Sequence, residues 1–273
     1  MMRNAVLIFL LPLAAVVPVI AQTDASLAKY LDHLPDLKLS EPTPQRYLVT
    51  SDYINLDIFG NFINKTRVEG EYTRGYQNGD VRWNHVQIAS ASTREGLFLD
   101  WAPQDYMENF IYSPQSNLMD AAAFPSFPPG SFQAKNLVWD VLTLEIVAWS
   151  YFDSLQLNKS YRPTNINGAV PLAGEGTFEN RDFQIIWTGI SKMNEEYCLL
   201  IEFRAFDNPL VVDTEQLKLR GRSHYWGEVW ISLKDKQIEH AVLYEDVVMK
   251  MNLNGMKDEQ LLDARREIIV EKQ

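Results

Sequence analysis

The sequence has one cysteine, few basic residues and no convincing internal repeat. Cys198 is the single cysteine among 273 residues, so the chain cannot form an internal disulfide and is not a disulfide-stapled miniprotein. Acids outnumber bases by 36 to 25, and the net charge of -11 argues against nucleic-acid binding, which needs a basic surface. Glycine and proline, 13 each, exclude a collagen-like chain, and a hydrophobic share of 46% supports a folded core.

Motifs for nucleotide, metal and acyl-transfer chemistry are also missing. Neither G-x-x-x-x-G-K-S/T nor G-x-G-x-x-G occurs, and H-E-x-x-H, C-x-x-C and acidic calcium loops are absent. The absence of G-x-S-x-G disfavours an α/β-hydrolase. The sequence therefore favours a non-enzymatic protein without metal or cofactor. The four histidines are far apart along the chain: His33, His85, His224 and His240.

The N-terminus has the pattern of a secretory signal peptide. Arg3 precedes an apolar run from Ala5 to Ile20, and small Ala21 follows it, so we expect residues 1–21 to be cleaved off before Gln22. Two prolines interrupt the run, which is also short of the roughly 20 residues of a spanning helix. We therefore expect no stable transmembrane anchor after cleavage, and the loss of Arg3 takes the net charge from -11 to -12.

An exported chain without disulfides fits a bacterial periplasm, with an extracellular location as the alternative. The context Tyr197-Cys198-Leu199-Leu200-Ile201 is apolar and strand-like, which predicts a buried, inert thiol. Two sequons, at Asn64 and Asn158, permit glycosylation and become relevant only in a eukaryotic source.

Proline placement and β patterning divide the remaining chain. Residues 22–46 are expected to hold a short helix over 24–33 and then a Pro-rich linker. From Tyr47 the pattern is β-like, and residues 47–273 are expected to form a single β-rich domain. Asn78-Gly79 predicts a hairpin, because both turn positions favour residues that adopt positive φ. Its arms would run over 67–76 and 81–88.

An inserted Pro-rich loop over 101–134 contains Phe124-Pro125-Ser126-Phe127-Pro128-Pro129-Gly130. Long irregular stretches of this kind are often functional. The next segment, 135–157, has apolar residues at three- and four-residue steps over more than half of the helix surface, which predicts a helix covered on most sides. Three acids interrupt it and argue against a membrane span: Asp140, Glu145 and Asp153.

Strand patterns dominate the rest of the chain. The expected fold class is α+β, mostly antiparallel β, with a curved sheet or half-barrel packed around a central apolar helix at about 135–157. The expected strands are 178–188, 196–206, 217–233, 237–251 and 267–270, with a helical turn over 261–266.

With a turn at Asp235-Lys236, Val229 would face Val242, and one side of strand 217–233 would be apolar. The other side is aromatic and acidic. Two interpretations stay open for it: a second, partly covered packing layer, or the lining of a ligand cavity in which aromatic rings supply contact area. That side carries His224, Trp226, Glu228 and Trp230, with Glu245 across from them.

Glu228 and Glu245 project from the same expected face. Glycoside hydrolysis requires two carboxylates about 5 to 10 Å apart across a cleft, and these two could be that close. Because the chain has 36 acids, some pair always fits such a pattern. A hydrolase using paired carboxylates is therefore kept only as a remote alternative.

The segment Gly221 to Leu233, G-R-S-H-Y-W-G-E-V-W-I-S-L, and its partner strand resemble uncharacterised exported bacterial β-domains. The order of long strands, a buried helix and a terminal meander is similar, over about 45–270 and in architecture only, to the half-barrel of periplasmic lipoprotein carriers. This resemblance implies a curved antiparallel sheet that wraps helices around an apolar cavity. No family motif is matched, so no residue role is carried across.

We therefore expect an exported, periplasmic, non-enzymatic binding or carrier protein for an apolar or amphipathic ligand such as a lipid. The alternative is a cell-envelope interaction or scaffold module that binds an envelope protein through its surface. An open cavity beside Trp226 and Trp230 would favour the first. The candidate ligand-binding residues are His224, Trp226, Glu228, Trp230, Glu245, Phe124 and Phe127.

Overall fold

The computed structural model describes residues 25–32, 34, 36, 38–39, 44–215, 217–253 and 258–273. The expected signal peptide over 1–21 lies outside the described residues. The first helix, α1 (Ala25–Asp32), matches the short helix expected over 24–33. No described helix combines the length and the hydropathy that crossing a bilayer would require.

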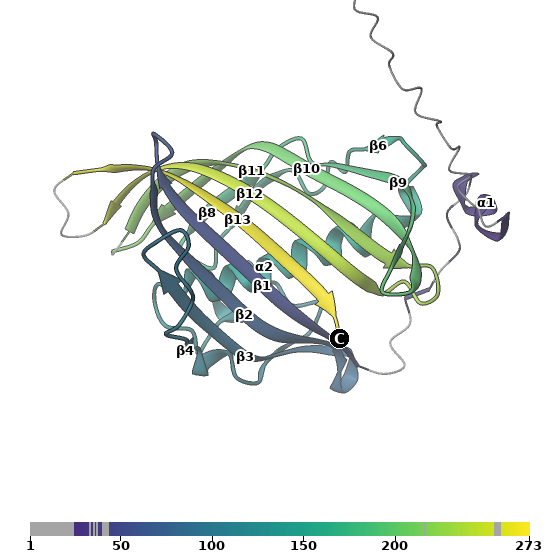
Figure 1. The fold of residues 1–273 in the computed structure, drawn as a ribbon, viewed down its shortest axis with the longest axis horizontal. Coiled ribbons are helices and arrows are strands. Elements are labelled where there is room, and N and C mark those ends of the chain that lie inside the picture. The colour runs from purple at the N-terminus through teal and green to yellow at the C-terminus, as the bar shows by residue number, and fades with distance from the viewer. Residues whose placement is uncertain are drawn as a thin grey trace, which may run out of the picture.

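The main element is an open antiparallel sheet of thirteen strands: β1 (Gln45–Asp57), β2 (Phe62–Tyr76), β3 (Asp80–Ala91), β4 (Ala102–Pro103), β5 (Phe110–Tyr112), β6 (Ser160–Tyr161), β7 (Gly168–Pro171), β8 (Gly176–Asn180), β9 (Gln184–Met193), β10 (Glu196–Asp213), β11 (Leu217–Ser232), β12 (Ile238–Leu253) and β13 (Gln260–Lys272). Its order is β4-β3-β2-β1-β13-β12-β11-β10-β8-β7. The strands β5, β6 and β9 pair beside this path, with β3, β9 and β10 respectively. The expectation of a mostly antiparallel β fold is confirmed (Figure 1).

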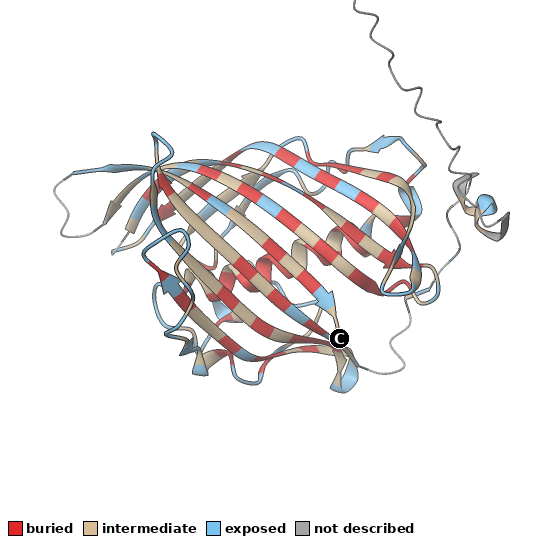
Figure 2. Ribbon diagram, in the orientation of Figure 1, coloured by how far each residue is buried: buried red, intermediate tan, exposed pale blue. Residues whose placement is uncertain are grey.

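Buried and more exposed side chains alternate along the long strands (Figure 2). This period of two is the pattern of a sheet with one face on the core and the other toward solvent. In β1, for example, Tyr47 and Val49 are buried, whereas Arg46 and Leu48 are exposed. Cys198 of β10 is buried, and burial raises the pKa of its thiol to about 12, as its apolar context predicted.

One long helix, α2 (Phe132–Glu145), continues into a π turn, Ile146–Ser150, and lies along the sheet (Figure 1). Its apolar residues share one core cluster with apolar residues of both halves of the sheet. The expected bounds of 135–157 are wrong at both ends. The helix begins three residues earlier, at Phe132, and Tyr151 leaves the helical region with φ -120° and ψ 6°.

The Asn78-Gly79 hairpin is confirmed. Asn78 has φ 60° and Gly79 has φ 84°, and they join β2 to β3 in a short 3₁₀ turn, η1 (Gln77–Gly79). Two other expectations are wrong. The strand expected over 178–188 divides into β8 and β9, since Asp182 between them takes a positive φ of 47°. The helical turn expected over 261–266 is part of β13, because pairing with β1 and β12 holds it extended.

The β11–β12 register differs by one residue from the expected one. Trp230 lies opposite His240 and Val229 opposite Ala241, and the register shifts between Trp230 and Ile231. Because successive side chains point to opposite faces, a shift of one exchanges the two faces of β12. The residues that move from the expected outer face to the buried one are Ala241, Leu243 and Glu245.

Candidate ligand-binding groove

An aromatic cluster fills the space between β5 and the first turns of α2. The rings of Phe124 and Phe127 lie 4.9 Å apart, and they lie 5.8 Å and 4.9 Å from the ring of Phe110 on β5. Trp139 of α2 meets Phe124 edge to face at 6.0 Å and donates its indole N–H to the Leu118 carbonyl at 2.8 Å. The structure thus brings the two candidate phenylalanines together, with Phe124 buried and Phe127 half-buried.

The Pro-rich loop builds this cluster because its prolines prevent a continuous helix. The chain instead forms β4, β5 and two 3₁₀ turns, η2 (Asp105–Met107) and η3 (Ala121–Ala123), before α2 begins. Pairing of β5 with β3 sets Phe110 opposite Trp83 and Tyr112 opposite Val81. The expected loop over 101–134 is therefore shorter and more regular than predicted, and its last three residues are helical.

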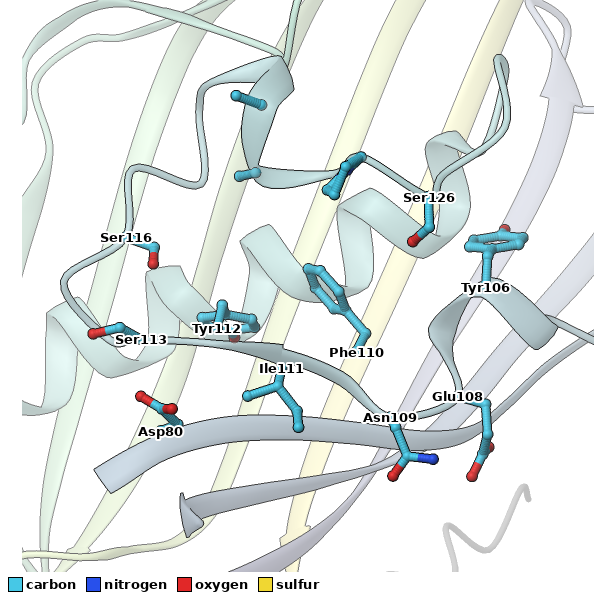
Figure 3. Close-up of a pocket in the computed structure, with 13 residues that line it drawn as sticks. Asp80, Tyr106, Glu108, Asn109, Phe110, Ile111, Tyr112, Ser113, Ser116 and Ser126 are labelled. Atoms are coloured by element: carbon cyan, nitrogen blue, oxygen red, sulfur yellow. The ribbon is translucent and has the colours of Figure 1, made fainter. Parts of the chain in front are cut away.

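A groove of about 610 Å³ opens beside this cluster (Figure 3). It lies between β5 and the segment that runs from η3 to Ser126, with Tyr106 at one end. Figure 3 shows Phe110 and Tyr112 projecting from one side of β5 and Ile111 from the other. Ligand sites commonly have volumes of about 300 to 1,000 Å³, so the groove is large enough for a lipid-like or drug-sized molecule.

The polar groups of the lining are acids, hydroxyls and an amide, with no Lys, Arg or His among them. Asn109 takes a positive φ of 57°, and its backbone N–H donates to Asn84 Oδ1 at 3.1 Å, which holds this corner of the groove. Burial raises the pKa of Tyr112 to about 12, so its hydroxyl stays neutral. This chemistry suits neutral or cationic polar groups better than anionic ones. The polar lining residues are Asp80, Glu108, Asn109, Ser113, Ser116 and Ser126.

Four of the candidate residues lie elsewhere, on the outer face of β11. Trp226 is 37% exposed and stacks on Tyr244, with ring centroids 5.8 Å apart. The ring of Trp230 lies 5.1 Å from that of His240. These residues line neither the groove nor a smaller hollow of about 240 Å³ beside α1. The four outer-face residues are His224, Trp226, Glu228 and Trp230.

Glu245 is on the opposite, buried face of the sheet. Its carboxylate accepts a hydrogen bond from Ser223 Oγ and pairs with Arg266 of β13 at 2.8 Å. Arg266 also pairs with Asp140 of α2. Glu228 and Glu245 therefore project from opposite sides of the sheet, and the expectation that they share a face is wrong. They cannot flank one glycosidic bond.

A second buried ion pair links α2 to β2. Arg74 lies 2.6 Å from Glu145, and the Tyr72 hydroxyl donates to the same carboxylate. Two of the three acids that interrupt the apolar helix pattern, Asp140 and Glu145, thus attach the helix to the sheet, whereas Asp153 is exposed. Sequence reasoning missed these pairs because the partners of Glu145 and Asp140 lie 71 and 126 residues away. It also missed Tyr106, Phe110 and Tyr112, although the run of aromatic and β-branched residues Phe110-Ile111-Tyr112 could have indicated a short strand.

Comparison with known proteins identifies no family. No family model matches the chain, and no curated protein matches it. Lipovitellin, described for its lipid–protein interactions, is similar with a TM-score of 0.43 and 11% identity, over 84% of this chain. The chain spans 25% of the lipovitellin chain. A DUF1329 family protein from Desulfovibrio piger has a TM-score of 0.12 and 9% identity, over 85% of each chain. At these scores neither likeness supports a conclusion about function.

Among the described residues, no three or more His, Cys, Asp or Glu side chains are grouped closely enough to hold a metal ion.

Proposed function

We propose that the chain is an exported, non-enzymatic binding or carrier protein of a bacterial periplasm, and that its ligand is apolar or amphipathic. The observation that carries the proposal is the groove beside β5, where aromatic rings lie next to hydroxyl and amide groups. An apolar wall with a few convergent polar groups is the usual composition of a small-molecule site. A lipid or another amphipathic molecule would place its apolar part against Phe110 and its polar part toward the serines.

The helix α2 occupies the middle of the half-barrel in this proposal. Support comes from its two ion pairs, through Glu145 to β2 and through Asp140 to β13, on neighbouring parts of the sheet. Support also comes from the single core cluster that α2 shares with the strands. In this arrangement α2 occupies the interior of the half-barrel, where a carrier without such a helix would hold its ligand. The ligand of this chain would therefore bind in the groove beside β5.

Binding of the neutral dye N-phenyl-1-naphthylamine, together with native mass spectrometry of the purified chain, tests this function. Ala122 lines the groove and is exposed, so Ala122→Trp should fill the site and weaken dye binding about tenfold or more. Ala169→Trp, at an exposed position on β7, is the matched control and should bind as the parent does. A parent chain that neither retains nor binds any apolar or amphipathic molecule would contradict the proposal.

A cell-envelope interaction module is the second candidate function. The stacked and exposed pair Trp226 and Tyr244 favours it, because aromatic rings on an outer sheet face are typical of contact surfaces. Cross-linking in cells should then recover a reproducible envelope partner, and Trp226→Ala should abolish that cross-link. Recovery of the same partner with the variant would remove this candidate.

A further inference from the structure

Three side chains stand out as the most exposed large hydrophobic groups of the described residues. Phe59 is 84% exposed, Leu97 is 75% exposed and Leu99 is 72% exposed. Phe59 lies in the turn between β1 and β2, and the two leucines lie in the loop between β3 and β4. Scattered exposed hydrophobic residues are normal, but a group of them at one place marks an interaction site.

The two segments lie at the same end of the sheet (Figure 1). Pairing of Lys65 with Ala91 sets the end of β3 beside the start of β2, directly after the turn that carries Phe59. The Lys65 ammonium donates to the Arg94 carbonyl at 2.8 Å, which fastens the β3–β4 loop to β2. The three apolar side chains therefore belong to one end of the molecule, which we call the apolar tip (Phe59, Leu97 and Leu99).

Cations and aromatic rings lie next to the apolar tip. Lys65 and Arg67 each approach the ring of Phe98 at 4.9 Å, and Arg94 lies 5.5 Å from the ring of Phe62. Within the described chain, Lys65 and Arg94 have no carboxylate partner, whereas Arg67 pairs with Asp52. Aromatic rings and long cationic side chains beside inserted apolar groups are the composition found at the headgroup level of a bilayer.

We propose that the apolar tip docks reversibly on a lipid surface, independently of what the groove binds. Phe59, Leu97 and Leu99 would enter the acyl boundary, while Lys65 and Arg94 would lie at the phosphate level. A lipid surface is the occupant that fits, because the tip consists of separate protruding side chains beside two cations that have no carboxylate partner within the described chain. The net charge of -11 opposes strong attraction to anionic membranes, so apolar insertion provides most of the affinity and zwitterionic vesicles suffice.

Flotation with phosphatidylcholine vesicles tests the docking. The triple variant Phe59→Ser, Leu97→Ser, Leu99→Ser should lower vesicle partitioning about tenfold or more. The control triple Leu48→Ser, Tyr197→Ser, Phe206→Ser removes exposed hydrophobic groups that are 39%, 42% and 45% exposed away from the apolar tip, and it should float as the parent does. All three proteins keep the apolar run Ala5–Ile20, so any binding through that run is common to them.

A dye at the tip gives a second, site-specific measurement of the docking. Leu97→Cys labelled with an environment-sensitive fluorophore should shift to the blue on addition of vesicles, and Leu48→Cys should not. Thermal melts of each variant show whether it is folded. No spectral shift at position 97, or equal flotation of the parent and the tip triple, overturns the proposal. Equal losses from the two triples also overturn it.

Discussion

Arg266 on β13 pairs with Asp140 on α2 and with Glu245 on β12, so one guanidinium serves two buried carboxylates. The side chains of all three residues are only 10% to 12% exposed. A buried charge is tolerated when it is paired, and here one cation faces two anions from separate elements. The triad attaches the helix to the sheet and leaves one negative charge in excess.

Removal of the cation should strongly destabilise the fold. Arg266→Met leaves Asp140 and Glu245 buried without a counter-charge, and we expect a loss of about 3 to 5 kcal/mol in the free energy of unfolding. Arg265→Met, at an exposed position on the same strand, should change it by less than about 0.5 kcal/mol. Urea denaturation measures both, and similar losses from the two variants would show that the triad does not carry stability.

The same triad should make stability depend on pH. Burial, with a further contribution from Glu245, raises the pKa of Asp140 to about 6, although Arg266 opposes the shift. Between about pH 4 and pH 6, Asp140 is therefore protonated in the folded state and ionised in the unfolded state. Its contribution to the free energy of unfolding falls as the pH rises through that window. The residues that face it are Arg266, Glu245 and Tyr53.

Asp140→Asn removes this titration. Relative to the parent, the variant should gain up to about 3 kcal/mol in the free energy of unfolding between pH 4 and pH 7. Asp153→Asn, which changes an exposed acid after the helix, is the matched control. Urea titrations at both pH values measure the effect, and parallel profiles for Asp140→Asn and the parent would contradict the raised pKa.

Gly227 should not tolerate a side chain. A Cβ at this position would lie 2.1 Å from the Val242 carbonyl oxygen and 2.7 Å from the ring of Phe203. Because the nearest obstacle is backbone, we expect Gly227→Ala to cost about 2 to 3 kcal/mol. Gly189→Ala is the matched control in β9, where a Cβ meets nothing within 4 Å, and thermal melts should show it no less stable than the parent.

Trp226→Ala tests whether the dye binds in the groove or on the outer face of the sheet. The residue is partly exposed and stacks on Tyr244, so its loss should cost about 1 kcal/mol of stability and leave dye binding in the groove unchanged. Fluorescence titration of the variant and of Ala122→Trp side by side measures the contrast. If Trp226→Ala weakens dye binding as much as Ala122→Trp does, the outer face is the binding site.

Local chemistry made several elements predictable from the sequence. Asn78-Gly79 specified its hairpin because few other residues take positive φ at two consecutive positions. The apolar spacing of 135–157 located α2, since a buried helix repeats its apolar residues on almost every side. Its C-terminal end was missed because a π turn and Tyr151 end the helix without a proline or glycine signal.

Long-range features were not predictable in the same way. The extra residue Glu239 shifts the β11–β12 register, and no local pattern distinguishes a bulged turn from a regular one. The groove depends on the pairing of β5, a short strand within the Pro-rich loop, with β3. Composition indicated only Phe124 and Phe127, which pack on Phe110 beside the groove and do not line it. Trp226 and Trp230 were misleading because large aromatic residues occur on covered and uncovered faces alike.

The pairing of β1 with β13 has a consequence for how the chain reaches its native state. Tyr47 lies opposite Lys272, so the first and last strands of the sheet in chain order are immediate neighbours. The halves β1–β3 and β10–β12 can each form from near contacts, but they join only when β13 inserts between them. Contacts between residues so far apart in the sequence slow folding. Until β13 pairs with both β1 and β12, each of these two strands exposes an unpaired edge to other chains. We therefore expect the folding chain to be most prone to aggregation before β13 inserts.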